Sequence, residues 1–370
     1  MSFFTGSPKG SSWQPVMTAD TTTSSYWFNW RVLLNTLWLL MSLVFAAYLI
    51  SKHEKLRYGQ DSEQNGSRET EKDPPGILYE DEVWRPCLKN LHPGWLLGFR
   101  IFAFIVLLLM LILNTTVDGA AIFYYYTQWT FALITIYFAL GSVLSMYGCF
   151  QYHNKVGGLG IQTENFDEEN GAHGASKIIG SQRFDSEHGA YAVSTRMQQD
   201  DAGNSTGKSL GPIEEPPRQI AGFWGYIFQI IFQMNAGAVM LTDCIFWFIL
   251  VPFLALRDYN LNFLIINMHS INAVFLLGET ALNSLRFPWF RIAYFFLWTS
   301  VYVIFQWVVH ACISIWWPYP FLDLENSFSP IWYLSVGLMH IPCYGLFVLI
   351  IKAKHTLMLK YFPHTYQHPR

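Results

Sequence analysis

Charged residues are scarce in this sequence. Aspartate, glutamate, lysine and arginine make up 13% of its 370 residues, whereas an average soluble domain has roughly 25%. Hydrophobic residues make up 52% of the chain, and most charges gather in two blocks and at the C-terminus. The stretches between these blocks have the ~20 apolar residues that are needed to cross a bilayer core of ~30 Å. The sequence therefore predicts an all-α, polytopic membrane helix bundle and argues against a soluble domain.

Cysteine motifs and targeting segments are also missing. The five cysteines include no CxxC pair of the kind that holds zinc. None of them falls in a predicted lumenal loop, so we expect no structural disulfide. The N-terminal segment has no basic stretch followed directly by a short apolar stretch, which argues against a cleaved signal peptide. We expect no cofactor, no bound metal and no nucleic-acid partner, and the lipid bilayer is the expected environment.

Seven stretches are long and apolar enough to be membrane spans. The fourth is too long for one straight crossing, so we expect a kinked or interfacial start near Gly222–Gly225, a bend near Asn235–Gly237 and a far end near Pro252. The seven predicted spans are 27–50, 94–114, 121–149, 223–256, 260–285, 288–317 and 329–352.

Polar segments divide the chain between these spans. Residues 150–222 are rich in glycine, serine, amides and acids, and such a segment cannot bury enough apolar area to offset its ordering entropy. We therefore expect a disordered loop there, and a similar loop at 51–93 whose part after Ile77 lies along the membrane surface. The predicted division is a polar tail at 1–26, three spans in 27–149, the loop 150–222, four spans in 223–352, and a tail at 353–370.

The basic residues predict an orientation. With seven spans, 19 of the 23 lysines and arginines lie on one side. Lys9, Arg31 and Arg257 lie on the other side, and Arg100 lies inside the second span. Because cytoplasmic loops carry the excess of basic residues, we expect a cytosolic C-terminus and a lumenal or extracellular N-terminus. The expected location is the endomembrane system or the plasma membrane.

Polar residues inside the spans follow stripes. Polar groups in a membrane are costly and usually face the bundle interior. A stripe in the fifth span is either a polar seam between helices, which we favour for Asn283 and Arg286, or part of a functional site, which stays open for His269. Asp243 needs a partner, for which His340 or Arg100 would serve. The fifth span carries Asn262, His269, Asn272, Glu279, Asn283 and Arg286 at helical spacing, and the sixth carries Thr299, Tyr302, Gln306, His310 and Ser314.

Three histidines and one threonine lie in the predicted lumenal half of the membrane. At 1.5 Å per residue from the lumenal ends of their spans, His269, His310 and His340 lie roughly 13, 10 and 18 Å deep. Thr127 lies roughly 9 Å deep by the same rise. This threonine is either a nucleophile or a residue that bonds the carbonyl four positions back. The histidines could converge on a cavity, although no histidine spacing on one helix is typical of a metal site.

Two stretches resemble a known family. They are "YYTQW" at Tyr125–Trp129, and the stretch from "MHSINAVFLLGET" at Met268 to "WWPYPFLD" ending at Asp323. Both resemble the rolling stone family of membrane proteins. More distantly, they are similar to the androgen-induced transmembrane family, which includes threonine hydrolases of fatty acid esters of hydroxy fatty acids. The resemblance covers roughly residues 94–150 and 222–352, and not the two polar loops.

The resemblance implies a catalytic pair. The catalytic threonine of the hydrolases in the androgen-induced family matches Thr127, and their catalytic histidine matches His269. The resemblance thus implies hydrolysis of a lipid ester by a threonine whose proton a histidine accepts. Asn272 would then orient the imidazole or donate to an oxyanion. We expect Thr127 and His269 to share a cavity lined by His310, with Glu279, His340 and Asp243 as supporting residues. The alternatives are a non-enzymatic scaffold or trafficking and fusion factor of the rolling stone type and, less favoured, a histidine metal site or a transporter.

Overall fold

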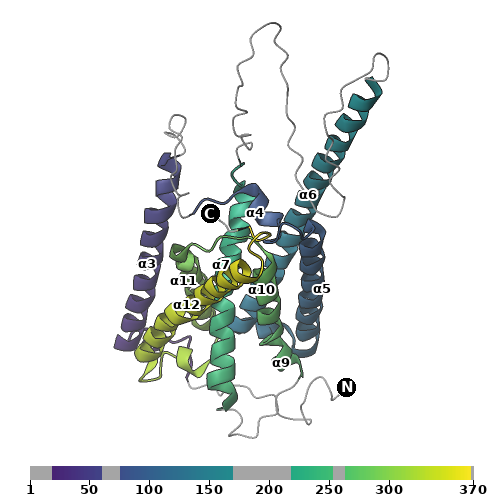
Figure 1. Cartoon of the computed structure of the whole chain (residues 1–370). Helices are drawn as coiled ribbons and strands as arrows, with labels where there is room; N and C mark the ends of the chain where they lie inside the picture. Colours follow the sequence, from purple (N-terminus) through teal and green to yellow (C-terminus); the bar gives the residue numbers. More distant parts are fainter. Residues whose placement is uncertain (1–18, 61–75, 170–217, 253–262, 368–370) are drawn as a thin grey trace.

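The computed structural model describes residues 19–60, 76–169, 218–252 and 263–367 (Figure 1). Within these ranges the chain is helical, and the only β-type pairings are three isolated bridges. Seven of the described helical segments are long and apolar enough to span a membrane. The chain is therefore an all-α, multi-pass integral membrane protein, as the sequence predicts.

The seven spans agree with the predicted ones to within a few residues at most ends. The first three spans are Trp30–Glu54 within α3 (Trp30–Gln60), the whole of α5 (Pro93–Asp118), and Tyr126–Asn154 within α6 (Tyr126–Glu169). The fourth, Phe223–Phe248, consists of α7 (Phe223–Ile245) and the start of the π-helix η2 (Phe246–Leu250), and the fifth, Phe263–Leu282, consists of α9 (Phe263–Met268) and α10 (Ile271–Leu282). The sixth, Trp289–Cys312, consists of η3 (Trp289–Arg291) and α11 (Ile292–Cys312), and the seventh is α12 (Ser329–Tyr361). Shorter helices are α2 (Ser24–Trp27), α4 (Glu80–Trp84), η1 (Ala120–Tyr124) and η4 (Pro320–Leu322).

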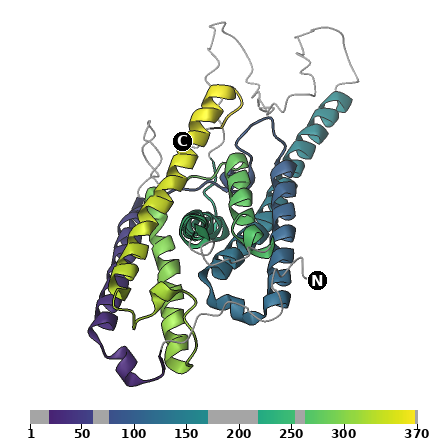
Figure 2. The same ribbon diagram turned by 90° about the horizontal axis from the view of Figure 1, so that it is seen from below.

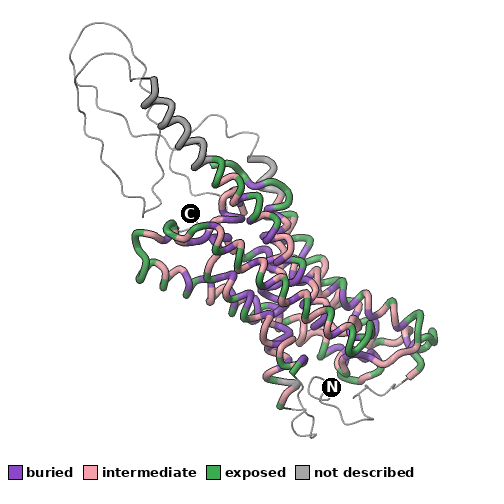
Figure 3. Tube along the Cα trace, turned by 90° about the vertical axis from the view of Figure 1, so that its right-hand side faces the viewer, coloured by how far each residue is buried: buried purple, intermediate pink, exposed green. Residues whose placement is uncertain are grey.

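Helix α7 forms the centre of the bundle. Figure 2 shows it nearly end-on, with α3, α11 and α12 on one side and α5, α6 and α10 on the other. Of the most apolar 18-residue stretch of its span, 61% is buried, whereas only 17% of the corresponding stretch of α3 is buried. Buried residues gather in the middle of the bundle (Figure 3). The exposed apolar side chains of α3, such as Leu33, Leu40 and Val44, therefore form a surface for lipid.

The fourth span differs from its prediction. The bend expected near Asn235–Gly237 is absent, because α7 runs unbroken from Phe223 to Ile245. Gly237 instead allows close packing, since a Cβ there would lie 2.3 Å from the ring of Phe295. The irregular part comes later, as a π-helix that begins at Phe246. Such single π-turns occur mostly inside α-helices and often at functional sites.

The fifth span is broken, which also differs from the prediction. Helix α9 ends at Met268 and α10 begins at Ile271. The Trp247 indole donates to the carbonyl of His269 at 2.8 Å, which satisfies a backbone group near the break. The predicted polar stripe is therefore not carried by one continuous helix. Asn262 lies outside the described residues, and Arg286 lies beyond the end of α10.

The bundle has two faces. We call the end with Ala19 and η4 the amino face, and the end with α4 and Tyr366 the carboxyl face. Each span crosses from one to the other, so the first and last described residues lie at opposite ends (Figure 1). On the carboxyl face, the predicted loops are partly ordered. Helix α6 continues through residues 150–169, where the sequence predicts disorder, and residues 170–217 lie outside the described part.

The segment after Ile77, for which the sequence predicts a position along the membrane surface, packs against the bundle at its carboxyl face. Leu78 is fully buried, and its carbonyl accepts from the Ala221 amide at 2.8 Å. Glu82 of α4 is 4% exposed and pairs with Arg286 at 3.1 Å and Arg218 at 3.3 Å. Burial raises the pKa of the Glu82 carboxyl, and the two arginines oppose this shift. Three distant chain segments are thereby joined beneath the carboxyl face.

Seven crossings make a prediction about the two chain ends. We expect a tag at the N-terminus and a tag at the C-terminus to differ in protease protection in sealed microsomes, because an odd number of spans separates them. The excess of basic residues on the side of the carboxyl face predicts that the C-terminal tag is the one digested. Equal protection, or equal digestion, of both tags would contradict the seven-span topology.

Candidate functional site

Thr127 lies in the first turn of α6 and is 9% exposed. Its hydroxyl lies 3.5 Å from the Tyr319 hydroxyl. Its hydroxyl makes no hydrogen bond to the carbonyl four residues back, that of Phe123, which accepts from the Trp129 indole at 2.9 Å. Among the described residues, Thr127 and the His269 ring share no hydrogen bond. The neighbours of these two residues are in contact: the Gln128 amide of α6 donates to the sulfur of Met268, the last residue of α9.

His269 lies at the break between α9 and α10. Its ring stacks on Phe246 of the π-helix, with 3.7 Å between ring centroids. Its Nδ1 lies 3.6 Å from Asp243 Oδ1, and the Asn272 amide donates to the same oxygen at 3.4 Å. Asp243 therefore faces His269 and Asn272, where the sequence predicts His340 or Arg100. Asn272 positions the carboxylate and makes no hydrogen bond to the imidazole.

His310 lies near the end of α11 and is fully buried. Its ring stacks on Trp317 at 3.6 Å, and its Nδ1 lies 2.7 Å from the Gln306 carbonyl. The Thr21 hydroxyl donates to its backbone carbonyl at 2.7 Å. The bond from Thr21 fixes the N-terminal segment to α11. His269, His310 and His340 do not contact one another, and no cluster of three or more potential metal ligands occurs in the described ranges.

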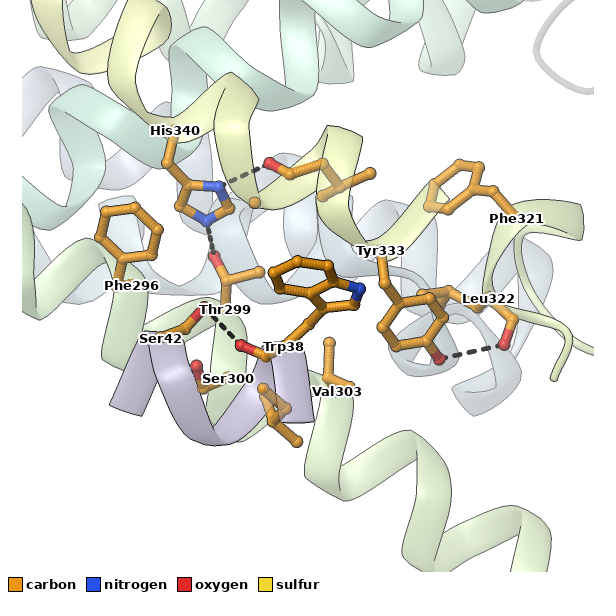
Figure 4. A pocket seen from close by; sticks show the side chains of 13 residues that line it. Trp38, Ser42, Phe296, Thr299, Ser300, Val303, Phe321, Leu322, Tyr333 and His340 are labelled. Carbon is orange, nitrogen blue, oxygen red and sulfur yellow. Dashed lines mark hydrogen bonds between the residues drawn. The ribbon is translucent and has the colours of Figure 1, made fainter. Parts of the chain in front are cut away.

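A different threonine and histidine are in contact. His340 of α12 points at Thr299 of α11 (Figure 4), and its Nε2 lies 2.8 Å from the Thr299 hydroxyl. Its Nδ1 lies 2.8 Å from the Val336 carbonyl. The Tyr126 hydroxyl lies 2.9 Å from the Thr299 hydroxyl. Phe295 and Phe296 stack on the ring, with centroids at 4.2 and 4.7 Å, and hold it in place.

These partners determine the protons of the pair. A carbonyl oxygen only accepts, so His340 Nδ1 must carry a proton that it donates to Val336. In the neutral ring, Nε2 is then the acceptor, and it accepts a hydrogen bond from the Thr299 hydroxyl. Since that threonine has one proton, Tyr126 must donate to the Thr299 oxygen. The result is a directed chain from Tyr126 through Thr299 to His340.

The bonding of Thr299 is unusual for this protein. A hydroxyl in a membrane helix commonly donates to the carbonyl four residues back, and Thr299 has no such bond to Phe295. It donates instead to a base on another helix, which is the arrangement that activates a nucleophile. The hydroxyls that do donate four residues back include those of Thr130, Thr135, Ser142, Thr242 and Thr280, at 2.7–3.2 Å.

The Thr299–His340 pair lines a cavity of about 60 Å³ between α3, α11, η4 and α12 (Figure 4). Ser42 and Ser300 contribute further hydroxyls, and Trp38 contributes an apolar wall. A cavity needs ~10–15 Å³ to hold one water, so this one accommodates a hydrolytic water and a small group beside it. Thr127, His269 and His310 are not among its lining residues, contrary to the predicted shared cavity.

Glu279, which the sequence predicts as a supporting residue of the site, is bonded instead to residues that hold the helices together. It and Arg100 are fully buried and form an ion pair of 2.6 Å. The Tyr137 hydroxyl donates to the same carboxylate at 2.9 Å, and the Asn283 amide does so at 3.4 Å. This places Glu279 in a polar seam between α5, α6 and α10. The sequence also predicts a seam for Asn283, whose backbone carbonyl accepts from the Lys354 ammonium of α12 at 2.6 Å.

Comparison of the chain with protein-family models, curated proteins and solved structures gives no match. The resemblance to the rolling stone family therefore stays a prediction.

Proposed function

We propose that this membrane protein is an intramembrane hydrolase of fatty acyl esters, with Thr299 as nucleophile and His340 as general base. The observation that supports the proposal is the 2.8 Å contact between His340 Nε2 and the Thr299 hydroxyl, at the wall of a cavity. A nucleophile, a base within hydrogen-bond reach and a third group that orients the base are the parts that covalent catalysis requires. Here the Val336 carbonyl is the third group.

The reaction follows from the direction of the hydrogen bonds. Thr299 Oγ1 attacks the ester carbonyl carbon while its proton passes to His340 Nε2. Tyr126, which donates to the Thr299 oxygen before the reaction, then donates to the developing oxyanion. The ester C–O bond then breaks, and the departing alcohol takes the proton from Nε2. Water attacks the acyl-threonine, gives a proton to His340, and releases the fatty acid as the proton returns to Thr299.

The family resemblance implies the same chemistry at Thr127 and His269. In favour of His269 are the carboxylate of Asp243 at 3.6 Å and the broken helix around it. Against this pair stands the absence of a contact between the two side chains, since the Thr127 hydroxyl faces Tyr319. The alternative function, a scaffold or trafficking factor of the rolling stone type, needs neither threonine to react.

A fluorophosphonate probe separates these proposals. We expect the purified full-length protein in lipid nanodiscs to be labelled at Thr299, as identified by peptide mass spectrometry, because this hydroxyl already donates to a base. Labelling should be lost in Thr299→Val and retained in Thr135→Val, whose hydroxyl donates to the Phe131 carbonyl at 2.8 Å. Labelling at Thr127 would favour the pair implied by the resemblance. No labelling together with no ester hydrolysis would favour the scaffold.

A further inference from the structure

A second, more polar pocket lies on the amino face. It has a volume of about 270 Å³ and is formed by the segment from Ala19 to Arg31 together with Glu325. Three of its lining residues are charged, namely Asp20, Arg31 and Glu325. The hydrolase proposal does not use this pocket, so its charges need a separate explanation.

The charges of this pocket are not paired with one another. The Arg31 Nη1 donates to the backbone carbonyl of Glu325, and the buried Arg31 Nε has no hydrogen-bond partner. No carboxylate of the described residues lies within ion-pair distance of this guanidinium, which has five donors in all. Hydrogen bonds from the Thr22 hydroxyl and amide, at 2.6 and 3.0 Å, lower the pKa of Asp20. That carboxylate is therefore ionised at neutral pH, and Glu325 is exposed beside it.

One cation and two carboxylates in one pocket complement a ligand that carries both signs of charge. A guanidinium fits the oxygens of a phosphate in a planar, two-bond arrangement. A primary ammonium has three donors for carboxylate oxygens. A phosphate joined to an ammonium by a short linker is the common form of a zwitterionic lipid headgroup, and the pocket has this combination of charges.

The polar pocket and the cavity of Thr299 and His340 are lined by the same two parts of the chain, α3 and the stretch around η4. Arg31, Trp38 and Ser42 are spaced seven and four residues apart, so they share one face of α3. Arg31 lines the polar pocket, whereas Trp38 and Ser42 line the cavity. At 1.5 Å per residue, Trp38 lies about 10 Å deeper than Arg31. On the opposite wall, Glu325 follows Leu322 of the cavity by three residues.

Both sites border a helix whose outer face is exposed. Helix α3 is the least buried span, and Leu33, Leu37 and Met41 are exposed on it. An acyl lipid that moves in from the bilayer along α3 can keep its headgroup at the membrane surface while its ester lies deeper. A water-soluble ester has no need of such an arrangement.

We infer that the substrate is a zwitterionic acyl lipid, whose phosphate binds Arg31 and whose ammonium binds between Asp20 and Glu325, so that its ester reaches Thr299. This inference rests on the proposed function. The headgroup pocket acts as a specificity determinant, because it selects which esters are held above the nucleophile.

The test compares two substrates with the same acyl chain, lysophosphatidylethanolamine and monoacylglycerol, on the full-length protein in nanodiscs. We expect kcat/KM to favour the zwitterionic substrate. Arg31→Gln should reduce that preference about tenfold, because it removes charge-assisted hydrogen bonds, and Arg31→Lys should retain most of it. The matched control is Lys52→Gln, a cation at the other end of α3 that donates to the Tyr48 hydroxyl, and its preference should equal that of the wild type.

Binding keeps this test separate from the test of hydrolysis. Equilibrium binding of lysophosphatidylethanolamine is measured on the Thr299→Val variant, with and without Arg31→Gln. If neither substrate is hydrolysed but binding still falls with Arg31→Gln, the proposed function is wrong and the headgroup pocket stands. If hydrolysis occurs but neither the preference nor the binding changes with Arg31→Gln, the headgroup inference is overturned and the hydrolase stands.

Discussion

Thr299→Val should lower kcat for ester hydrolysis by at least about 10³-fold, as expected for the loss of a covalent nucleophile. His340→Gln should cause a loss of about 10²–10⁴-fold, which is the usual contribution of a general base. Residues that act as one unit lose activity non-additively. The double variant Thr299→Val/His340→Gln should therefore be no slower than the slower single variant. Steady-state kinetics with an acyl ester of one chain length measures all three.

Stability must be measured beside activity in this experiment. Removing the Thr299 hydroxyl leaves His340 Nε2 buried without a donor, and such a loss costs about 1–3 kcal/mol. Thr135→Val removes a buried hydroxyl of another kind and serves as the control, because it should change activity less than twofold. If Thr299→Val retains wild-type kcat, Thr299 is a packing residue. If Thr127→Val or His269→Gln abolishes activity while Thr299→Val does not, the pair implied by the resemblance is the catalytic one.

The largest effect on stability should come from the ion pair between Arg100 and Glu279. Both side chains are fully buried, 2.6 Å apart, and the guanidinium also donates to the Val83 carbonyl at 2.9 Å. Removing one partner of a buried pair leaves an unpaired charge and costs about 3–5 kcal/mol. We expect Glu279→Gln and Arg100→Ala each to lower the midpoint of thermal unfolding in detergent by several degrees.

A paired replacement distinguishes charge from shape. Replacing both residues by apolar ones, as in Arg100→Met/Glu279→Leu, removes both buried charges and should cost less than either single change. The control is Arg85→Gln, which removes a partly exposed pair with Asp81 at 3.3 Å and should cost at most about 1 kcal/mol. A double variant less stable than both single variants would show that the hydrogen bonds of this cluster, rather than its charge balance, stabilise the bundle.

The sequence predicted those features that depend on composition along the chain. Spans such as 94–114 and 329–352 follow from runs of apolar residues, and these runs became α5 and α12. The polar character of Glu279 and Asn283 also predicted burial, because charges inside a span must face protein. What could not be predicted is the partner of each polar group. Asp243 and His269 are 26 positions apart on different spans, and their contact depends on the rotation of both helices.

The Thr299–His340 pair shows the same limit more sharply. Both residues are visible in the sequence as polar positions inside spans, yet 41 positions separate them. The sequence predicts Thr127 as the nucleophile because its neighbours resemble a family motif. The hydrogen bonds of a threonine, however, depend on which helix faces it. The only local signal for Thr299 is its place in a polar stripe on the sixth span. Helix breaks, such as the one at His269, also left no clear mark, because no proline or glycine stands there.

The joined segments under the carboxyl face have a consequence for how the chain is divided. The contacts of Glu82 with Arg286, Leu78 with Ala221 and Arg100 with Glu279 all link residues before 170 to residues after 217. Continuity of the chain between these positions is not needed to bring those partners together. A gene cut within that interval would yield two polypeptides of three and four spans that assemble in one membrane. Tyr126 would come from the first polypeptide and the Thr299–His340 pair from the second. Ester hydrolysis would therefore measure whether the two polypeptides assemble.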